Sequence, residues 1–217
     1  RLQLTSLNPI SLGYFGGILF LISLWNLLIF KDKSLFILIG IILGCWILIQ
    51  SNSRSPIIGV LLSTIFLVSY NKNQKLLIIL FSLSLIFLTY NYFLNTSSNI
   101  SYFESRIFLF EDGSISTRLS IYTGYIEAIK NNPILPYMDP LMNLMFAHNI
   151  FLAIYSSTGI LGLIIFLIII FNSLKASVKL IRYKLEYGWI ALIFIHTLVV
   201  SFFSGGLFDE NFWIILT

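Results

Sequence analysis

The sequence is built from repeated apolar runs that are long enough to cross a lipid bilayer. A bilayer core about 30 Å thick needs roughly 20 apolar residues per helix. Such runs predict an all-α polytopic membrane helix bundle, a single membrane domain over residues 1–217 with about seven spans, the last of them truncated. The predicted spans are approximately Leu12–Phe30, Ser34–Gln50, Pro56–Tyr70, Leu76–Leu94, Ile150–Leu174, Gly188–Phe203 and Phe208–Thr217.

Charge is too scarce in this chain for a water-soluble surface. Charged residues make up 10% of the sequence and hydrophobic residues 58%, whereas about a quarter of the residues are charged in a typical soluble domain. The net charge of +4 is scattered, so no basic face is available for nucleic acid. The single cysteine, Cys45, excludes an intramolecular disulfide. Because the first residue is Arg1, we expect the chain to be a fragment.

One long polar segment, residues 95–148, interrupts the spans between the fourth and the fifth. The turns that contain Lys31, Lys72 and Lys175 fall on one side of the membrane, and that side carries more Lys and Arg, which indicates the cytoplasm. The long segment is then predicted to lie outside. Within it, Arg118–Lys130 has apolar residues at helical spacing, with Thr117 as a cap and residues 131–133 as a stop. We expect an amphipathic helix along the outer membrane interface.

Two pairs of glycines four residues apart and one histidine lie inside predicted spans. The pairs Gly13/Gly17 and Gly40/Gly44 favour close helix packing within the bundle, and a dimer interface is the alternative. For His196, a packing role and a proton relay both remain open.

Arg54 stands at the start of a predicted span. Ser55 can cap the following helix and Pro56 can take its first position, so the unpaired amide groups would face outward beside the guanidinium. The positive end of a helix dipole next to an Arg is an anion site, because it offers partial charge and bidentate donors. An arginine that contacts lipid headgroups is the alternative.

Arg118 is predicted to begin the amphipathic helix, with Tyr122 and Tyr125 following on one face. A cation at a helix N-terminus is mildly unfavourable in the dipole field, and a bound anion would compensate for it. A solvated charge is the alternative.

His148 comes directly before a long apolar run, together with Asn149. The positive field at a helix start disfavours the protonated imidazole, so His148 is a candidate neutral base. The alternative is a structural histidine at the interface. No Asp-x-Asp pair, His-x-x-x-His pair or cysteine cluster occurs in the sequence, so we predict neither a metal site nor a cofactor.

The order of these motifs resembles the O-antigen ligase and Wzy polymerase superfamily. The resemblance runs from about Asn8 to the C-terminus, with the chain as the C-terminal part of a longer member. It rests on Ser53-Arg54-Ser55-Pro56 with Gly59, Arg118-Leu119-Ser120-Ile121-Tyr122, Ala128-Ile129-Lys130-Asn131-Asn132-Pro133, His148-Asn149-Ile150-Phe151-Leu152 and Gly159-Ile160-Leu161-Gly162.

The resemblance implies a metal-independent membrane glycosyltransferase with a GT-C-like fold. It implies transfer of a glycan from undecaprenyl pyrophosphate to an acceptor hydroxyl on a lipid or a glycan, at the periplasmic face of the bacterial inner membrane. Arg54 and Arg118 would bind the pyrophosphate, His148 would accept the hydroxyl proton, and Asn149 and Tyr122 would contact substrate. The chain departs from the family between Pro133 and Pro140, where prolines stand in place of the usual Gly-x-Gly and so of the glycines that would let the backbone approach a substrate closely.

Three functions therefore remain to be compared. We favour the ligase, which takes a lipid acceptor; the polymerase of the same superfamily takes another lipid-linked repeat unit. A transporter or flippase is the second class, although the mid-span regions contain no Asp, Glu, Lys or Arg, which counts against ion-coupled transport. A noncatalytic membrane scaffold is the third.

Overall fold

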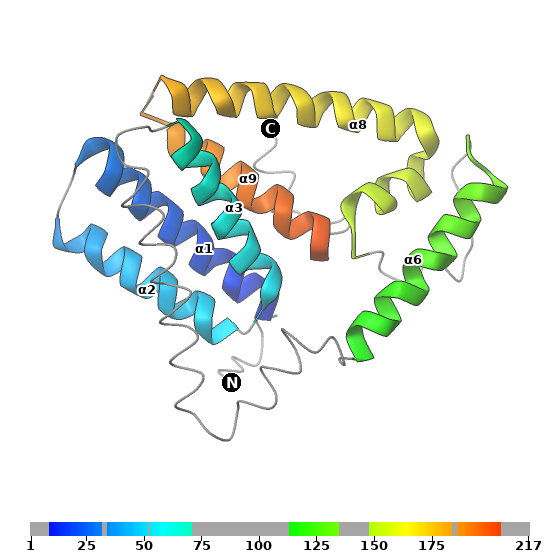
Figure 1. Ribbon diagram of the computed structural model, residues 1–217, viewed down its shortest axis with the longest axis horizontal. Helices are drawn as coiled ribbons and strands as arrows, with labels where there is room; N and C mark the ends of the chain where they lie inside the picture. Colours follow the sequence, from blue (N-terminus) through cyan, green and yellow to red (C-terminus); the bar gives the residue numbers. More distant parts are fainter. Residues whose placement is uncertain are drawn as a thin grey trace. The chain divides into compact units, whose positions relative to one another are not determined.

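The computed structural model describes residues 9–31, 34–51, 53–70, 113–134, 148–183 and 186–204, with the backbone alone for 113–118. Every element within these ranges is a helix, so the prediction of an all-α protein is confirmed. The elements are α1 (Pro9–Trp25), η1 (Asn26–Phe30), α2 (Leu35–Ser51), α3 (Arg54–Tyr70), α6 (Gly113–Asn131), α8 (Ile150–Arg182) and α9 (Gly188–Ser204) (Figure 1). The predicted spans Leu76–Leu94 and Phe208–Thr217, and most of the 95–148 segment, lie outside the described residues.

Among the described helices, two are long and apolar enough to cross a membrane: Pro9–Phe30, which joins α1 to η1, and α8. The helices α2, α3 and α9 are apolar and shorter, with 17 residues each, close to the lower limit of about 17 residues for a span. Large apolar side chains on α2 and α8 face outward; Phe36 is 85% exposed and Leu161 is 70% exposed. Such surfaces suit lipid rather than water, and the chain is a membrane protein.

Two helices have bounds that differ from the prediction. The helix α6 begins at Gly113 rather than near Arg118, because the Ser- and Thr-rich stretch before Arg118 contains no proline and can continue the helix. The helix α8 continues past Leu174 to Arg182, because Lys and Arg near a helix C-terminus interact favourably with its dipole. The predicted stop after α6 is confirmed, since the helix ends at Asn131.

The contacts divide the chain into two compact units. The first contains α1, η1, α2, α3, the end of α8 from Ser173 and α9 to Val200. The second contains α6, α8 as far as Asn172 and the last turn of α9.

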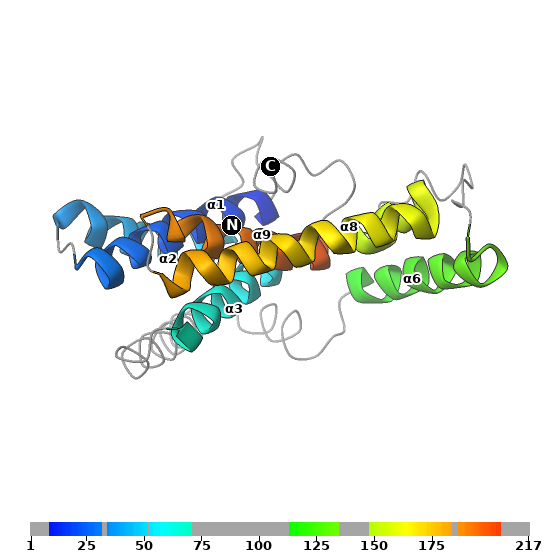
Figure 2. The ribbon, with the colours of Figure 1, turned by 90° about the horizontal axis from the view of Figure 1, so that it is seen from above.

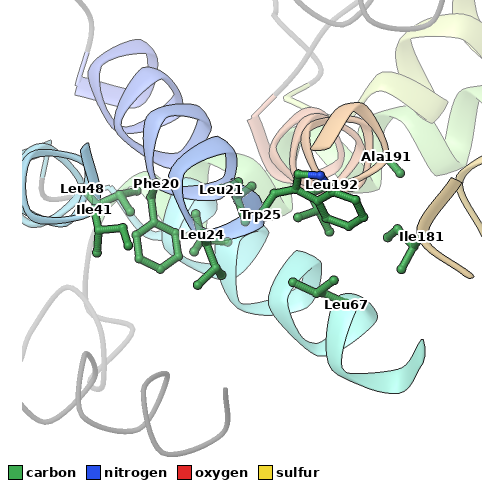
Figure 3. Close-up of a cluster of buried hydrophobic side chains, with 11 residues drawn as sticks. Phe20, Leu21, Leu24, Trp25, Ile41, Leu48, Leu67, Ile181, Ala191 and Leu192 are labelled. Atoms are coloured by element: carbon green, nitrogen blue, oxygen red, sulfur yellow. The ribbon is translucent and has the colours of Figure 1, made fainter. Parts of the chain in front are cut away.

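The helix α1 lies at the centre of the first unit, and the next two helices lie beside it (Figures 1 and 2). Its side chains point in two directions (Figure 3): Phe20 is directed toward Ile41 and Leu48 of α2, and Trp25 is directed toward Leu192 of α9. Trp25 and Leu192 are fully buried. In a membrane such side chains stabilise the bundle mainly through van der Waals packing, because lipid tails are as apolar as the core.

The glycine pairs bring helix backbones into contact. A Cβ atom added at Gly44 would lie 2.9 Å from the carbonyl oxygen of Gly16, and one added at Gly13 would lie 2.6 Å from Oγ of Ser51. Substituents at these positions would force the helices apart. The predicted packing role of both glycine pairs, within one bundle, is therefore confirmed.

His196 of α9 fills a space that two glycines leave open. Its side chain is fully buried, and its ring stacks on that of Tyr14 of α1 with centroids 5.4 Å apart. A Cβ atom added at Gly17 would lie 2.5 Å from Nε2, and one added at Gly59 would lie 2.5 Å from Nδ1. The hydroxyl groups of Tyr14 and Thr197 form a buried hydrogen bond of 2.9 Å beside the ring. The packing interpretation of His196 is supported by these contacts.

We expect Gly59→Ala to lower the free energy of unfolding by about 1–3 kcal/mol, because the new methyl group overlaps the imidazole. Removing that ring with His196→Ala should make room for the methyl group, so the double variant should be less destabilised than the sum of the two single variants. The free energy of unfolding in detergent micelles is measured for the unmodified protein, for each single variant and for the double variant. Additive effects would show that the two side chains do not compete for this space.

Candidate active site

Arg54 is the first residue of α3, and it belongs to the first unit. Its side chain is half-buried, and the following Ser55 and Pro56 are buried inside the first turn. The predicted cap at Ser55 is therefore wrong, since the helix begins one residue before it. The chain enters α3 from the end of α2, where Oγ of Ser51 donates to the carbonyl oxygen of Leu48 at 2.7 Å.

The second unit is held together by one face of α6 packed against the first turns of α8. Buried Tyr125 of α6 packs with Ala153 of α8, and Ile121 and Leu152 flank this pair. Burial raises the pKa of Tyr125, and a hydrogen bond with Ser156 opposes the rise. The phenol is therefore neutral near neutral pH and serves to join the two helices.

The chain that follows α6 binds to a break in α8. Gly159 has φ 70° and ψ −167°, a conformation that interrupts the helix and that glycine adopts readily. Beyond this break, the amide of Ile160 donates to the carbonyl oxygen of Ile134 at 3.3 Å. One turn earlier, the hydroxyl of Tyr155 donates to the carbonyl oxygen of Asn132 at 3.2 Å. These two bonds fix the end of α6 to the middle of the broken helix.

These contacts show that α6 and the first segment of α8 run in the same direction. Residues 125, 132 and 134 meet residues 153, 155 and 160 respectively, so both series of residue numbers increase together. Figures 1 and 2 show the two segments side by side with this orientation. The N-terminal half of α6 is therefore at the end of the pair where α8 begins.

His148 and Asn149 form that beginning of α8. His148 is half-buried and has φ 50°, a left-handed conformation that is uncommon outside glycine and in which Asn, Asp and His are enriched. Oδ1 of Asn149 accepts hydrogen bonds from the amides of Phe151 at 2.9 Å and Leu152 at 3.2 Å. Asn149 is thus the N-cap of α8, and its capping bonds hold the adjacent His148 in place.

The register brings four of the five predicted site residues to one end of the second unit. Arg118 occupies a helix position two turns before Tyr125 in α6. Tyr122 is half-buried one turn after Arg118. His148 and Asn149 begin the partner helix at the same end. The fifth, Arg54, stands in the other unit.

Some residues that join α6 to α8 were not among the predicted site residues. Tyr155 bonds the chain after α6, Ser156 bonds Tyr125 of α6, and Gly159, which the sequence analysis named only as part of a motif, breaks α8. A glycine inside a span, with Ser and Thr just before it, is the signal that indicates a break.

The fold and this site define an all-helical membrane protein with a polar, histidine-bearing helix start. Comparison with known families is consistent with that class. Residues 39–137 match the family described as O-antigen ligase. Over this stretch the chain is similar to the O-antigen ligase family, which confirms the resemblance predicted from the motif order. No curated protein and no solved structure matches the chain.

The matched stretch contains most of α2 and all of α3 and α6. It therefore includes Arg54, Arg118 and Tyr122, and it ends before His148 and Asn149. The assignment of His148 and Asn149 to the candidate site is supported by the motif resemblance and by the register of α6 against α8.

Proposed function

We propose that this protein is an O-antigen ligase-type membrane glycosyltransferase. It transfers a glycan from an undecaprenyl pyrophosphate carrier to an acceptor hydroxyl during synthesis of cell-surface polysaccharide. The observation that carries the proposal is the parallel register of α6 and α8, which supports a shared site for Arg118, Tyr122 and His148. The family match over α6 supports the same reaction class.

The reaction in this proposal is a displacement at the anomeric carbon of the donor. The acceptor oxygen forms a bond to that carbon while the bond from carbon to the pyrophosphate oxygen breaks, and the leaving group keeps the electron pair. His148 accepts the proton of the attacking hydroxyl. Arg118 and Arg54 stabilise the negative charge that grows on the pyrophosphate, through charge-assisted hydrogen bonds.

The remaining site residues position these groups. Asn149 uses its side-chain oxygen for the helix cap, so its amide nitrogen remains the group that can contact substrate. Tyr122 presents a half-buried ring and a hydroxyl on the same helix as Arg118. Both suit contact with a sugar, since aromatic rings and amides bind apolar and polar faces of carbohydrates respectively.

The proposal places the site at the periplasmic face of the bacterial inner membrane, in a bundle of about seven predicted spans with a GT-C-like arrangement. Exposed Leu119 and Ile126 lie on α6 away from the buried Tyr125, which supports a helix with one face toward lipid. The donor and the acceptor are both membrane-bound, so the reaction would run at the surface of the bilayer.

A transfer assay with purified full-length protein tests this proposal. We expect a lipid-linked glycan to be moved from undecaprenyl pyrophosphate onto a lipid A core acceptor, and we expect a chelator of divalent cations to leave the rate unchanged. Extension of a second lipid-linked repeat unit, without transfer to lipid A core, would identify a polymerase instead. Movement of the donor across vesicles without any new glycosidic bond would overturn the enzymatic function.

A further inference from the structure

The first unit contains a cavity that the proposed reaction does not use. It has a volume of about 450 Å³ and is lined by Asn26, Phe30, Glu186, Tyr187 and Trp189. This volume falls within the range of about 300–1,000 Å³ that is typical of small-molecule sites. The cavity lies where η1 ends and α9 begins, among residues that precede and follow the O-antigen ligase match.

One wall of the cavity is the π-helix η1. Its wide turn closes where the amide of Lys31, in a left-handed conformation with φ 55°, donates to the carbonyl oxygen of Asn26. Short π-helical turns are rare and occur frequently at functional sites. Nδ2 of Asn26 donates to the carbonyl oxygen of Ile22 at 3.0 Å, so Oδ1 remains as the acceptor that this amide can offer to a ligand.

The other wall of the cavity is the turn into α9, which packs closely against Trp25 of α1. Gly188 is buried, and a Cβ atom there would overlap the indole of the fully buried Trp25. Because a larger residue does not fit at position 188, the turn into α9 is pressed against α1. Tyr187 and Trp189, the neighbours of Gly188 in the chain, are therefore fixed at the cavity.

The lining has the chemistry of an ammonium site. Glu186 supplies a carboxylate and Asn26 an amide oxygen, and both accept hydrogen bonds from N–H donors. The three aromatic side chains supply rings, whose faces attract cations. Among the residues that the structure describes, Glu186 forms no ion pair with a Lys or Arg that would occupy this place.

The surroundings of the cavity suit the phosphate and the acyl chains that accompany an ammonium group in a zwitterionic lipid. The indole N–H of Trp189 and the hydroxyl of Tyr187 are donors for phosphate oxygens, and exposed Lys31 follows Phe30 directly. Phe30 is 48% exposed and Ile190, next to Trp189, is 37% exposed, so apolar surface adjoins the cavity. Trp and Tyr with nearby Lys are typical of the level of the headgroups in a bilayer.

We infer that this cavity binds the headgroup of a phospholipid with a primary ammonium group, phosphatidylethanolamine. The ammonium lies between Glu186, Asn26 and the aromatic rings, and the phosphodiester lies toward the donors of Trp189 and Tyr187. A carboxylate in the lining disfavours a purely anionic headgroup. The site is on the side of the membrane that carries Lys31, which the charge distribution predicts to be cytoplasmic.

The test measures lipid binding and does not depend on glycan transfer. The full-length protein is placed in phosphatidylglycerol nanodiscs that contain a small fraction of phosphatidylethanolamine, and retained lipids are counted by native mass spectrometry. We expect selective retention of phosphatidylethanolamine, with about tenfold weaker binding in Glu186→Gln, the loss expected for one charge-assisted contact. Glu186→Asp should keep most of the binding, because it keeps the charge.

Glu127→Gln is the matched control, since Glu127 is an exposed glutamate on α6 and lies far from this cavity in sequence. It should retain phosphatidylethanolamine as the unmodified protein does. Equal retention of both lipids, or unchanged binding in Glu186→Gln, would overturn the inference. Equal competition by free phosphoethanolamine would also overturn it, because the occupant would then be a soluble amine rather than a lipid.

Discussion

Replacing His148 with glycine is expected to lower the rate of glycan transfer by about 10²–10⁴-fold, the usual contribution of a general base. Glycine is a suitable substitution, because it adopts φ 50° without the cost of about 1–2 kcal/mol that a Cβ atom carries in this conformation. The loss would then report the missing imidazole rather than a distorted helix start. The transfer assay with purified protein measures it.

His148→Asn is the control for this experiment. Asparagine tolerates the left-handed conformation and keeps a polar side chain, but it cannot accept a proton near neutral pH. We expect a loss of rate as large as that of the glycine variant, with unchanged thermal unfolding. Transfer at the normal rate in either variant, in properly inserted protein, would remove His148 from the mechanism.

Replacing Arg118 with glutamine is expected to lower transfer by about 10²–10³-fold, as the loss of one donor to a developing oxyanion does in other enzymes. Arg118→Lys should recover part of the rate, because it restores the charge without the bidentate geometry. The loss should fall mainly on kcat, since the charge on the pyrophosphate is greatest in the transition state.

Lys130→Gln is the matched control for Arg118. Lys130 is an exposed cation at the other end of α6, about three turns from Arg118, so its removal changes the charge of the same helix without changing the proposed site. We expect a rate within about twofold of the unmodified protein, as for most surface substitutions. Equal losses in both variants would indicate a general electrostatic effect of α6, and would contradict a specific role for Arg118.

Most helix positions could be predicted because run length alone constrains them. The described helices α2, α3 and α9 begin and end within about two residues of their predicted bounds. The start of α6 was harder, since Gly113 and Ser114 are compatible with both a turn and a helix. The break at Gly159 was missed because its neighbours are apolar, and the periodicity of a span continues through it.

The candidate site was predicted as separate residues and not as an arrangement. Arg118 and His148 were selected from their chemistry and their motifs, without any information on distance. That the two helix starts share one end follows from Tyr125 on Ala153, and from the bonds of Asn132 and Ile134 to α8. Those contacts join residues that lie 23 to 28 positions apart, and the hydrophobic periodicity of the sequence does not predict which of these residues meet.

The sequence by itself determined that this protein is helical and embedded in a membrane, because apolar runs without charge cannot be placed in water and must satisfy their backbone groups internally. It also supplied the cations and the imidazole. Only the tertiary structure decided that α6 runs parallel to α8, that His196 fills the space left by Gly17 and Gly59, and that Glu186 shares a cavity with three aromatic rings. These features depend on how the side chains of residues distant in the sequence pack together. Local patterns of hydrophobicity do not predict that packing.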